Sequence, residues 1–382
     1  MNDINRLLIS LLTCAVRGES ADAVFFASLG DEEIKKVYAL AKKHDLAHLV
    51  GVALENAPPQ VKQQFKQFFA ESVKAMYRYE WLNGEMEKIC SLLEKSRIPY
   101  IPLKGTVIRA LYREPWHRTS CDIDILIPKE CLDKACFALE TELSYTRGKR
   151  SRHDVSLTAP NGVHLELHFD IDEIYVDCSE FWEDAKPAAD GSCQYVLSAE
   201  MLILTHIAHM AKHFVNGGCG LKPFLDLWLL KEKLTYDPEK LQKLFQSHGL
   251  AEFSRASLGL VDVWLDGKQP NEIETVMASF VLSGGVYGSL DNKITVTRSK
   301  GKSKFGYAIE RIFPPYSSLK VAYPILNSYP CLMPICWGRR WFRLLRAGKL
   351  KQIKTEYSIN HRLNVDQLNN TDKMLKLLGL NM

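Results

Sequence analysis

The chain has little that would place it among membrane-spanning, repetitive or disulfide-stabilised proteins. It contains no run of about 18 apolar residues, so a membrane-spanning helix is not expected. Its ten cysteines include no Cys-x-x-Cys pair, which argues against structural zinc and, in 382 residues, favours reduced thiols. There is no low-complexity tract and no internal repeat. These absences predict a folded, cytoplasmic protein of several domains.

Basic and acidic residues nearly balance, but they are unevenly distributed along the chain. The sequence has 49 Lys and Arg against 45 Asp and Glu. Between Gly288 and Lys354, however, 14 basic residues stand against only two acidic ones, Asp291 and Glu310. Such a stretch is typical of a segment that meets an acidic partner, a phosphate-rich ligand, an anionic membrane or the acidic remainder of the same protein.

The residue pattern changes three times along the chain and predicts an α+β fold. A small mixed-sheet core is expected between helical N- and C-terminal domains. The mildly hydrophobic start is interpreted as an amphipathic helix, with a signal peptide as the alternative. Pro58 and Pro59 open a longer helix that is expected to continue to Lys95. The predicted domains are a helical domain over residues 1–96, the core over 97–177, a second helical domain over 178–285 and a basic, Pro/aromatic-rich region over 286–382.

Short strands and helices are predicted to alternate within the core. The strands are expected at Ile98–Leu103, Asp122–Ile127, His153–Thr158 and Val163–Phe169, and the helices at Thr106–Arg113 and Pro128–Leu143. The third and fourth strands are joined by Ala-Pro-Asn-Gly, residues 159–162, which is a strong hairpin signal.

Two carboxylates stand two residues apart in the second of these strands. Asp122 and Asp124 therefore point to the same side of the strand. Side by side, they are electrostatically costly unless a cation lies between them, and oxygen ligands of this kind suit Mg²⁺. If the strand of residues 163–169 is a neighbour, Glu166 becomes a third carboxylate. Three carboxylates with two Mg²⁺ ions are suited to in-line attack on a nucleotide α-phosphorus.

A second element, Lys104-Gly105, stands between a predicted strand and a predicted helix. A turn of this kind directs free backbone N–H groups at an anion. The side chain of Lys104 would add a positive charge for the β- and γ-phosphates.

Taken in order, these motifs resemble a known family. They are Leu103-Lys-Gly105, then Arg118-x-Ser120-x-Asp122-x-Asp124-Ile-Leu-Ile, and Glu166-Leu-His168. Residues 101–170 resemble the polymerase-β-like nucleotidyltransferase superfamily and, within it, the uncharacterised nucleotidyltransferases. The resemblance extends weakly to residues 206–226 and to Phe313-Pro-Pro, Leu332-x-Pro334 and Trp337.

The resemblance implies nucleotidyl transfer, with Asp122, Asp124 and Glu166 as metal ligands. One departure concerns the phosphate contacts. The superfamily usually has Gly-Ser after the first strand, whereas this chain has Lys104, Gly105 and Thr106. The hydroxyl of Thr106 or the amine of Lys104 would take the place of that serine.

Two further residues precede the acidic pair on the same loop. Arg118 is interpreted as a phosphate contact and Ser120 as a residue that positions the loop. The alternative is a surface arginine and an ordinary turn serine.

Several histidines and one aspartate are candidates for the acceptor side of the site. His164 and His168 share the strand face of Glu166, so each is a candidate for supporting the metal ligands or binding the acceptor. His209 and His213, together with His206, lie on one helix face that we expect to meet the catalytic cleft; a zinc site is the alternative. Asp226 is expected to hold Lys222 or a histidine, or to form a buried ion pair.

The sequence therefore predicts a Mg²⁺-dependent nucleotidyltransferase. It would move an NMP from an NTP, with ATP as the expected donor, to a hydroxyl or phosphate of a small molecule, a peptide or protein, or an RNA, and release pyrophosphate. The alternative is a non-catalytic nucleotide-binding or adaptor module with a basic docking tail. Residues 339–354 combine bases with Trp341 and Phe342, which fits contact with an anionic membrane, with nucleic acid or with the protein's own body.

Overall fold

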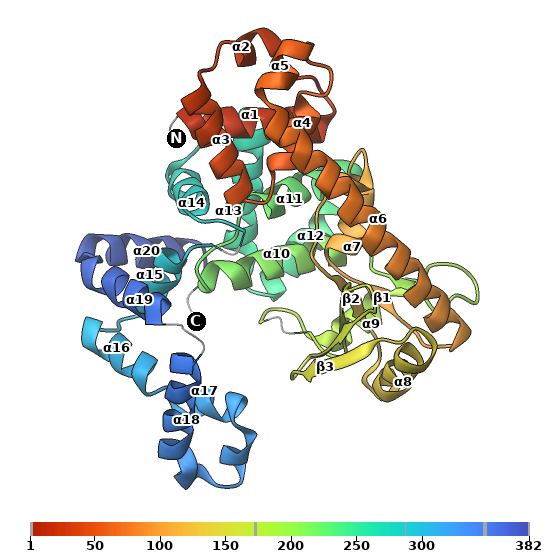
Figure 1. Cartoon of the computed structure of the whole chain (residues 1–382), viewed down its shortest axis with the longest axis vertical. Coiled ribbons are helices and arrows are strands. Elements are labelled where there is room, and N and C mark those ends of the chain that lie inside the picture. Colours follow the sequence, from red (N-terminus) through yellow and green to blue (C-terminus); the bar gives the residue numbers. More distant parts are fainter. Residues whose placement is uncertain (1–2, 172–173, 287, 347–349, 381–382) are drawn as a thin grey trace.

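The computed structural model of the chain describes residues 3–171, 174–286, 288–346 and 350–380. Within them, helices predominate, and the strands form a mixed five-stranded sheet on one side of the molecule (Figure 1) and a two-stranded sheet, which agrees with the α+β class expected from the sequence. No helix in the described part of the chain is long and apolar enough to cross a membrane.

The N-terminal part is helical, as its residue spacing predicts. The helix expected after Pro59 is divided at Phe65, whose ring is fully buried and packs beside the rings of Phe26 and Phe68. The position of this break depends on tertiary packing. The N-terminal helices are α1 Asp3–Arg17, α2 Ala23–Ala27, α3 Asp31–Lys43, α4 Ala47–Ala53, α5 Pro59–Gln64 and α6 Lys66–Lys95.

Five strands form the main sheet, in the order β1-β2-β5-β4-β3. Strand β1 is antiparallel to β2, β2 is parallel to β5, and β5, β4 and β3 follow as an antiparallel series. The expected hairpin is β4 and β5. Strand β3 was not anticipated because its five residues are all exposed and include no alternating apolar side chains. The strands are β1 Ile101–Pro102, β2 Ile123–Leu126, β3 Thr146–Arg150, β4 Asp154–Thr158 and β5 His164–His168.

Alternation along the strands gives the sheet one apolar and one polar face. Ile123 and Ile125 of β2 lie beside Leu165 and Leu167 of β5 and bury against α6 and α8. The intervening residues of both strands point to the opposite face, which is where the predicted carboxylates lie. The core also includes α7 Gly105–Ile108, η1 Arg109–Leu111, η2 Pro115–His117, η3 Lys129–Cys131 and α8 Leu132–Glu142. The helices expected at 106–113 and 128–143 are thus shorter than predicted and are completed by 3₁₀ turns.

The helices after the core pack on the N-terminal helices. Apolar residues of α1–α5 and of α10–α14 form one hydrophobic core, so residues 1–96 and 178–285 are separate in sequence but joined in packing. The division of the chain into four domains stays a prediction. This part contains α9 Cys178–Asp184, β6 Lys186–Pro187, β7 Tyr195–Val196, α10 Ala199–Val215, α11 Lys222–Lys233, α12 Pro238–Ser247, α13 Ala251–Leu265 and α14 Glu272–Ser283.

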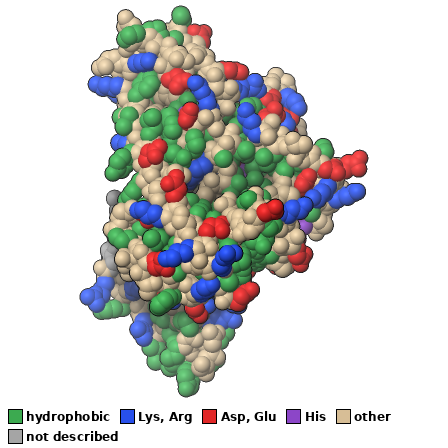
Figure 2. Space-filling model, turned by 90° about the vertical axis from the view of Figure 1, so that its right-hand side faces the viewer, with side chains coloured by type: hydrophobic (Ala, Val, Ile, Leu, Met, Phe, Trp, Pro, Cys, Tyr) green, Lys and Arg blue, Asp and Glu red, His purple; other side chains and the backbone are tan. Residues whose placement is uncertain are grey.

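The C-terminal helices extend away from the sheet (Figure 1). They have small hydrophobic clusters of their own. Figure 2 shows hydrophobic side chains at the lower end of the molecule. Ile325, Tyr329 and Ile335 of these C-terminal elements are exposed. The basic stretch predicted over 339–354 falls on two helices, with residues 347–349 outside the described residues. The elements are α15 Leu290–Ser299, α16 Lys304–Ile312, α17 Tyr316–Ala322, η4 Pro324–Asn327, η5 Pro330–Leu332, α18 Met333–Arg346, α19 Leu350–Arg362 and α20 Val365–Leu377.

Candidate active site

The parallel pairing of β2 and β5 brings three ionisable side chains together on the polar face of the sheet. Asp124 is directly opposite Glu166 in the register, and His168 lies two residues further along β5. His168 Nε2 donates to Asp124 Oδ1 at 2.9 Å and lies 3.6 Å from Glu166 Oε2. One ligand atom from each of the three residues lies within 4.8 Å of the others. The sheet thus confirms the expected adjacency of the two strands.

Lys104 completes this cluster from the loop after β1. Its Nζ donates to Asp124 Oδ1 at 2.9 Å, so one carboxylate oxygen is shared by an amine and an imidazole. Burial alone would raise the pKa of Asp124, but the hydrogen bond from His168 and the charge of Lys104 lower it strongly. Burial would lower the pKa of Lys104, and the Asp124 charge more than reverses this effect. At neutral pH both groups are therefore charged.

Asp122 and Glu166 differ electrostatically from Asp124. Burial and the neighbouring Asp124 charge raise the pKa of both carboxyl groups. Asp122 precedes the first residue of β2 and lies outside the 4.8 Å group formed by Asp124, Glu166 and His168. The Asp124 charge nevertheless raises the pKa of Asp122, and the Asp122 charge raises that of Glu166, so Asp122 lies within electrostatic range of the other two carboxylates.

The turn that carries Lys104 has an unusual backbone. Lys104 has φ 49° and ψ −123°, a conformation that glycine adopts readily and a lysine only with strain. Gly105 follows at the start of α7, and a Cβ atom there would lie 2.4 Å from Nη1 of Arg118. The next residue, Thr106, is half-buried, and its N–H donates to the carbonyl of Leu103 at 3.2 Å. The turn is thus held tightly in place.

A buried arginine connects this turn with the loop before β2. Arg109 donates through Nε to the carbonyl of Gly105 at 3.1 Å and through Nη2 to Ser120 Oγ at 2.6 Å. Its guanidinium also lies 5.7 Å from the ring centroid of Tyr79 on α6. Ser120, the predicted loop-positioning residue, is therefore itself positioned by Arg109. The sequence analysis did not single out Arg109, because no local motif marks an arginine that acts through backbone contacts.

Asp226 forms the buried ion pair that was one of the expectations for it, but its partner, Arg118, was not anticipated. Arg118 Nη2 donates to Asp226 Oδ2 at 2.8 Å, and Nη1 donates to the carbonyl of Thr119 at 3.1 Å. Tyr112 donates to Asp226 Oδ1 at 2.8 Å. Asp226 is fully buried; burial would raise its pKa, but Arg118 lowers it. The interpretation of Arg118 as a surface residue is therefore wrong, and its guanidinium is directed at Asp226.

Lys222 has different partners from those expected. Its Nζ donates to Asp45 Oδ2 at 2.7 Å and to Thr119 Oγ1 at 2.8 Å. Asp226 is thus held by Arg118 and Tyr112, whereas Lys222 joins α11 to the loop before β2 and to the end of α3. Both Arg118 and Lys222 also donate to the carbonyl oxygen of Thr119, at 3.1 and 3.2 Å. Neither network has a local sequence signature, because the partners are more than 70 residues apart.

The predicted histidines lie in two places. His164 shares a hydrogen bond of 2.8 Å with Ser156 on β4. On α10, the Nε2 atoms of His209 and His213 are 3.0 Å apart, while His206 Nε2 lies 2.8 Å from the carbonyl of Pro223. Burial and then the nearby charges of His209, Lys212 and Lys104 lower the pKa of His213 to about 4. Lys104 thus lies within electrostatic range of His213; that this face of α10 meets the catalytic cleft stays a prediction.

The donor set at the polar face of the sheet fits a divalent metal ion. The negative charges of three carboxylates, those of Asp122, Asp124 and Glu166, are only partly balanced by the positive charge of Lys104. Carboxylate oxygens are also the ligands that hard divalent cations prefer. His168 directs its Nε2 at a carboxylate oxygen, the arrangement of an imidazole that orients a metal-binding carboxylate. Within the described residues, Asp124, Glu166 and His168 have ligand atoms close enough together that they could hold a metal ion.

Comparison with protein families identifies the class. A family described as uncharacterised nucleotidyltransferase matches residues 30–266, more than half of the chain. This chain belongs to that family, and the enzyme class predicted from the sequence is confirmed. The matched residues include the strand pair, the Lys104 turn and Asp226.

Two further comparisons complete the findings. Among solved structures, the solution structure of the antibiotic-resistance factor ANT(2'')-Ia is similar, with 17% sequence identity and a TM-score of 0.34; the alignment covers 48% of this chain and 96% of that one. A likeness at this level does not identify an acceptor. No curated protein matches the chain.

Proposed function

We propose that this chain moves an NMP from an NTP, with ATP as the expected donor, to a hydroxyl or phosphate of an acceptor and releases pyrophosphate. The observation that carries the proposal is the register of β2 and β5, which sets Asp124 opposite Glu166 beside His168. Burying two carboxylates at adjacent positions is costly unless a cation joins them. Because the chain belongs to a nucleotidyltransferase family, we expect a cation held by this cluster to act in nucleotidyl transfer.

Asp122, Asp124 and Glu166 are the residues that we assign to hold Mg²⁺, with two ions expected. Bound Mg²⁺ supplies Lewis-acid stabilisation of the charge on the phosphate oxygens and lowers the pKa of an acceptor hydroxyl. His168 orients Asp124 by donating to Oδ1, and Asp124 is the most buried of the three carboxylates.

The Lys104 turn and the neighbouring loop are assigned to the triphosphate. The side chain of Lys104 is 39% exposed, so its amine is accessible to a phosphate while remaining beside Asp124. The backbone N–H groups of Gly105 and Thr106 lie at the start of α7. Ser120 Oγ accepts a hydrogen bond from Arg109, which leaves the hydroxyl proton of Ser120 to donate to a phosphate oxygen. For Arg118 we propose a positioning role through Asp226 in place of the phosphate contact.

The proposed reaction is a single in-line displacement. The acceptor oxygen forms a bond to the α-phosphorus while the bond between that phosphorus and the bridging oxygen of the β-phosphate breaks, so pyrophosphate leaves. Glu166, whose side chain is 32% exposed, is placed to receive the proton of the acceptor hydroxyl. His164, His209 and His213 are proposed to contribute to the acceptor side of the cleft. A small molecule, a peptide or protein, and an RNA all stay open as acceptors.

The experiment is incubation of the protein with α-labelled NTPs, Mg²⁺ and a cell extract. We expect label to enter an acceptor, with one pyrophosphate released for each NMP transferred. Asp124→Asn should lower the rate at least about 100-fold, because one metal-binding charge is lost. Asp133→Asn, an exposed aspartate on α8, is the control for loss of a negative charge and should leave the rate unchanged.

Two outcomes would contradict the proposal. The first is an Asp124→Asn variant that is folded by circular dichroism and as active as the unaltered protein. The second is NTP binding that is equally tight without Mg²⁺ and gives neither pyrophosphate nor labelled product. The second result would instead support a nucleotide-binding or adaptor module.

A further inference from the structure

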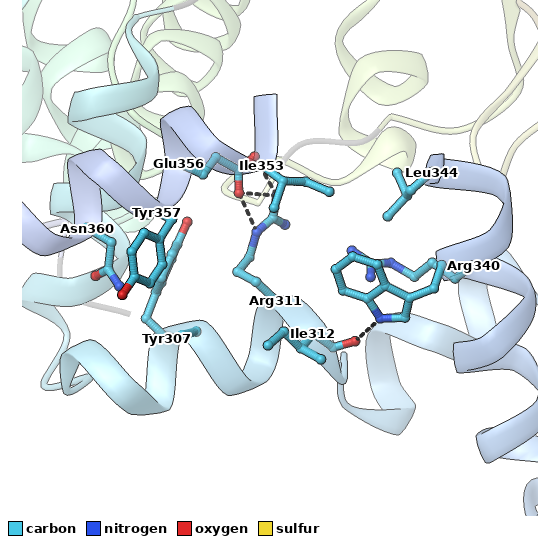
Figure 3. Close-up of a pocket in the computed structure, with 11 residues that line it drawn as sticks. Tyr307, Arg311, Ile312, Arg340, Leu344, Ile353, Glu356, Tyr357 and Asn360 are labelled. Atoms are coloured by element: carbon cyan, nitrogen blue, oxygen red, sulfur yellow. Dashed lines mark hydrogen bonds and ion pairs between the residues drawn. The ribbon is translucent and has the colours of Figure 1, made fainter. Parts of the chain in front are cut away.

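A pocket lies among the C-terminal helices, away from the carboxylate cluster. It has a volume of about 300 Å³ and is enclosed by side chains of α16, α18 and α19 (Figure 3). None of its lining residues belongs to the sheet or to α10. The pocket is therefore a separate place in the fold from the carboxylate cluster on β2 and β5.

The charges at this pocket do not cancel. Arg311 donates to Glu356 through Nε and Nη2, both at 2.8 Å, which makes a neutral bidentate pair on one wall. Arg340 on α18 is a second guanidinium at the same pocket. Its Nη1 is buried and, among the described residues, has no hydrogen-bond partner. The pocket therefore carries one positive charge beyond the Arg311–Glu356 pair.

Leaving a buried guanidinium N–H without an acceptor is costly, because the group has lost its hydrogen bonds to water and no hydrogen bond within the protein replaces them. The ring of Trp341 lies 5.5 Å from the Arg340 guanidinium, and Trp341 Nε1 donates to the carbonyl of Ile312 at 2.9 Å. The tryptophan is thus anchored, and its ring lies beside the guanidinium of Arg340, a residue that lines the pocket. Such an arrangement favours an anionic acceptor supplied from outside the chain.

The remainder of the pocket is mainly apolar. Ile312, Leu344 and Ile353 contribute aliphatic walls, and Tyr307 and Tyr357 contribute rings. Asn360 lies on the opposite side from Arg340 in Figure 3. Its Nδ2 donates to the carbonyl of Lys304 at 3.1 Å, while its buried Oδ1 has no donor among the described residues.

We propose that this pocket binds a small amphipathic anion. The anionic group, a carboxylate or phosphate, would accept from Arg340 Nη1, and an apolar body would lie against Ile312, Leu344 and Ile353. A hydroxyl or amide on the far end would donate to Asn360 Oδ1. A volume of about 300 Å³ is at the small end for ligand sites, which fits a medium-length acyl or an aromatic acid.

Decanoate is the probe, and calorimetric titration of the full chain is the measurement. We expect saturable binding, with decanol binding at least about tenfold more weakly because it has no charge for Arg340. Arg340→Gln should weaken decanoate binding at least about tenfold. Arg339→Gln removes the same charge from the preceding, exposed position and should leave binding unchanged. Leu344→Trp keeps Arg340 but fills the pocket, and should abolish binding.

Thermal unfolding distinguishes a ligand-binding role of Arg340 from a purely structural one. Arg340 is half-buried and its buried Nη1 has no acceptor among the described residues, so Arg340→Gln should leave the melting temperature of the ligand-free protein unchanged or higher. Decanoate should then raise the melting temperature of the unaltered protein and of Arg339→Gln, but not that of Arg340→Gln.

Three outcomes would overturn the proposal: no saturable decanoate binding, equal binding by Arg340→Gln and the unaltered protein, or equal weakening by Arg339→Gln and Arg340→Gln. A parallel test with phosphatidylglycerol vesicles distinguishes the membrane contact predicted for residues 339–354. Vesicle binding that both arginine variants weaken equally, without decanoate binding, would assign these bases to a membrane surface in place of a ligand pocket.

Discussion

Asp124 Oδ1 accepts hydrogen bonds from His168 Nε2 and from Lys104 Nζ, each at 2.9 Å. The two donors come from different sides: His168 from the adjacent parallel strand, and Lys104 from the loop that leaves β1. Asp124 is consequently fixed in orientation, with one oxygen engaged. The geometry explains how a short sheet of mostly four- and five-residue strands holds a carboxylate firmly at its polar face.

The contact between His168 and Asp124 predicts a change in metal dependence. His168→Ala should lower activity, or raise the Mg²⁺ concentration needed for half-maximal rate, by about 10- to 100-fold, because the carboxylate loses its orienting partner. His248→Ala is the control, since His248 contacts the carboxylate of Glu180, which lies outside the carboxylate cluster. The measurement is the rate of pyrophosphate release over a Mg²⁺ titration. Equal effects of the two variants would show that the Asp124 contact has no special importance.

The strained backbone of Lys104 predicts an order of stability between two variants. Lys104→Gly and Lys104→Ala both remove the amine, so they differ only in backbone freedom and one methyl group. At φ 49° and ψ −123°, glycine should give the larger free energy of unfolding, by roughly 1–3 kcal/mol. Urea denaturation of both variants checks this. An alanine variant as stable as the glycine variant would mean that the turn relaxes without cost.

The buried pair of Arg118 and Asp226 predicts a large loss of stability. Arg118→Ala leaves the Asp226 carboxylate buried and without its ion-pair partner, and should lower the free energy of unfolding by about 3–5 kcal/mol. Arg113→Ala removes an exposed partner of Glu55 and should cost less than about 1 kcal/mol. The double variant Arg118→Met with Asp226→Leu should be more stable than Arg118→Ala. If instead the two single arginine variants unfold alike in urea, the buried pair contributes no more than a surface one.

Three buried histidines predict that acid destabilises the fold. Burial lowers the pKa of His44, His48 and His117 to about 4, from the ordinary value of 6.5. His44 Nδ1 accepts from the N–H of Leu221 at 3.2 Å, which requires a neutral ring. As the pH falls from 6.5 towards 4, the unfolded chain binds protons that the folded chain does not. Stability is therefore complete above pH 6.5 and is lost below it, by about 1.4 kcal/mol per pH unit for each histidine.

The test of this pH dependence is urea denaturation at several values between pH 7 and pH 4.5. His48→Gln keeps a donor for the carbonyl of His117 and should make the dependence shallower by about 1 kcal/mol per pH unit. His361→Gln alters an exposed histidine on α19 and should leave the slope unchanged. A His48→Gln slope equal to that of the unaltered protein would remove His48 from the explanation.

The sequence by itself determined the features of this protein that depend on residues close together along the chain. The alternation of acidic and apolar residues in 122–127 and of polar and apolar residues in 163–169 places Asp124 and Glu166 on one face of each strand, because side chains in a strand alternate sides. The Ala-Pro-Asn-Gly turn specifies the hairpin of β4 and β5. Pro58 and Pro59 located the start of α5. Each of these features depends on neighbours only a few residues away.

The tertiary structure alone decided how those parts meet. The parallel register that sets Asp124 opposite Glu166 joins strands about 40 residues apart, and no local pattern specifies such a pairing. The same applies to Arg118 with Asp226 and to Lys222 with Asp45, where burial makes each charge depend on a distant partner. Strand β3, exposed along its length, is fixed by its ladder to β4 and not by its own residues. Local motifs thus identify the residue types of the site, whereas tertiary contacts bring those residues together. Sheet pairing and buried ion pairs form only when the chain has folded.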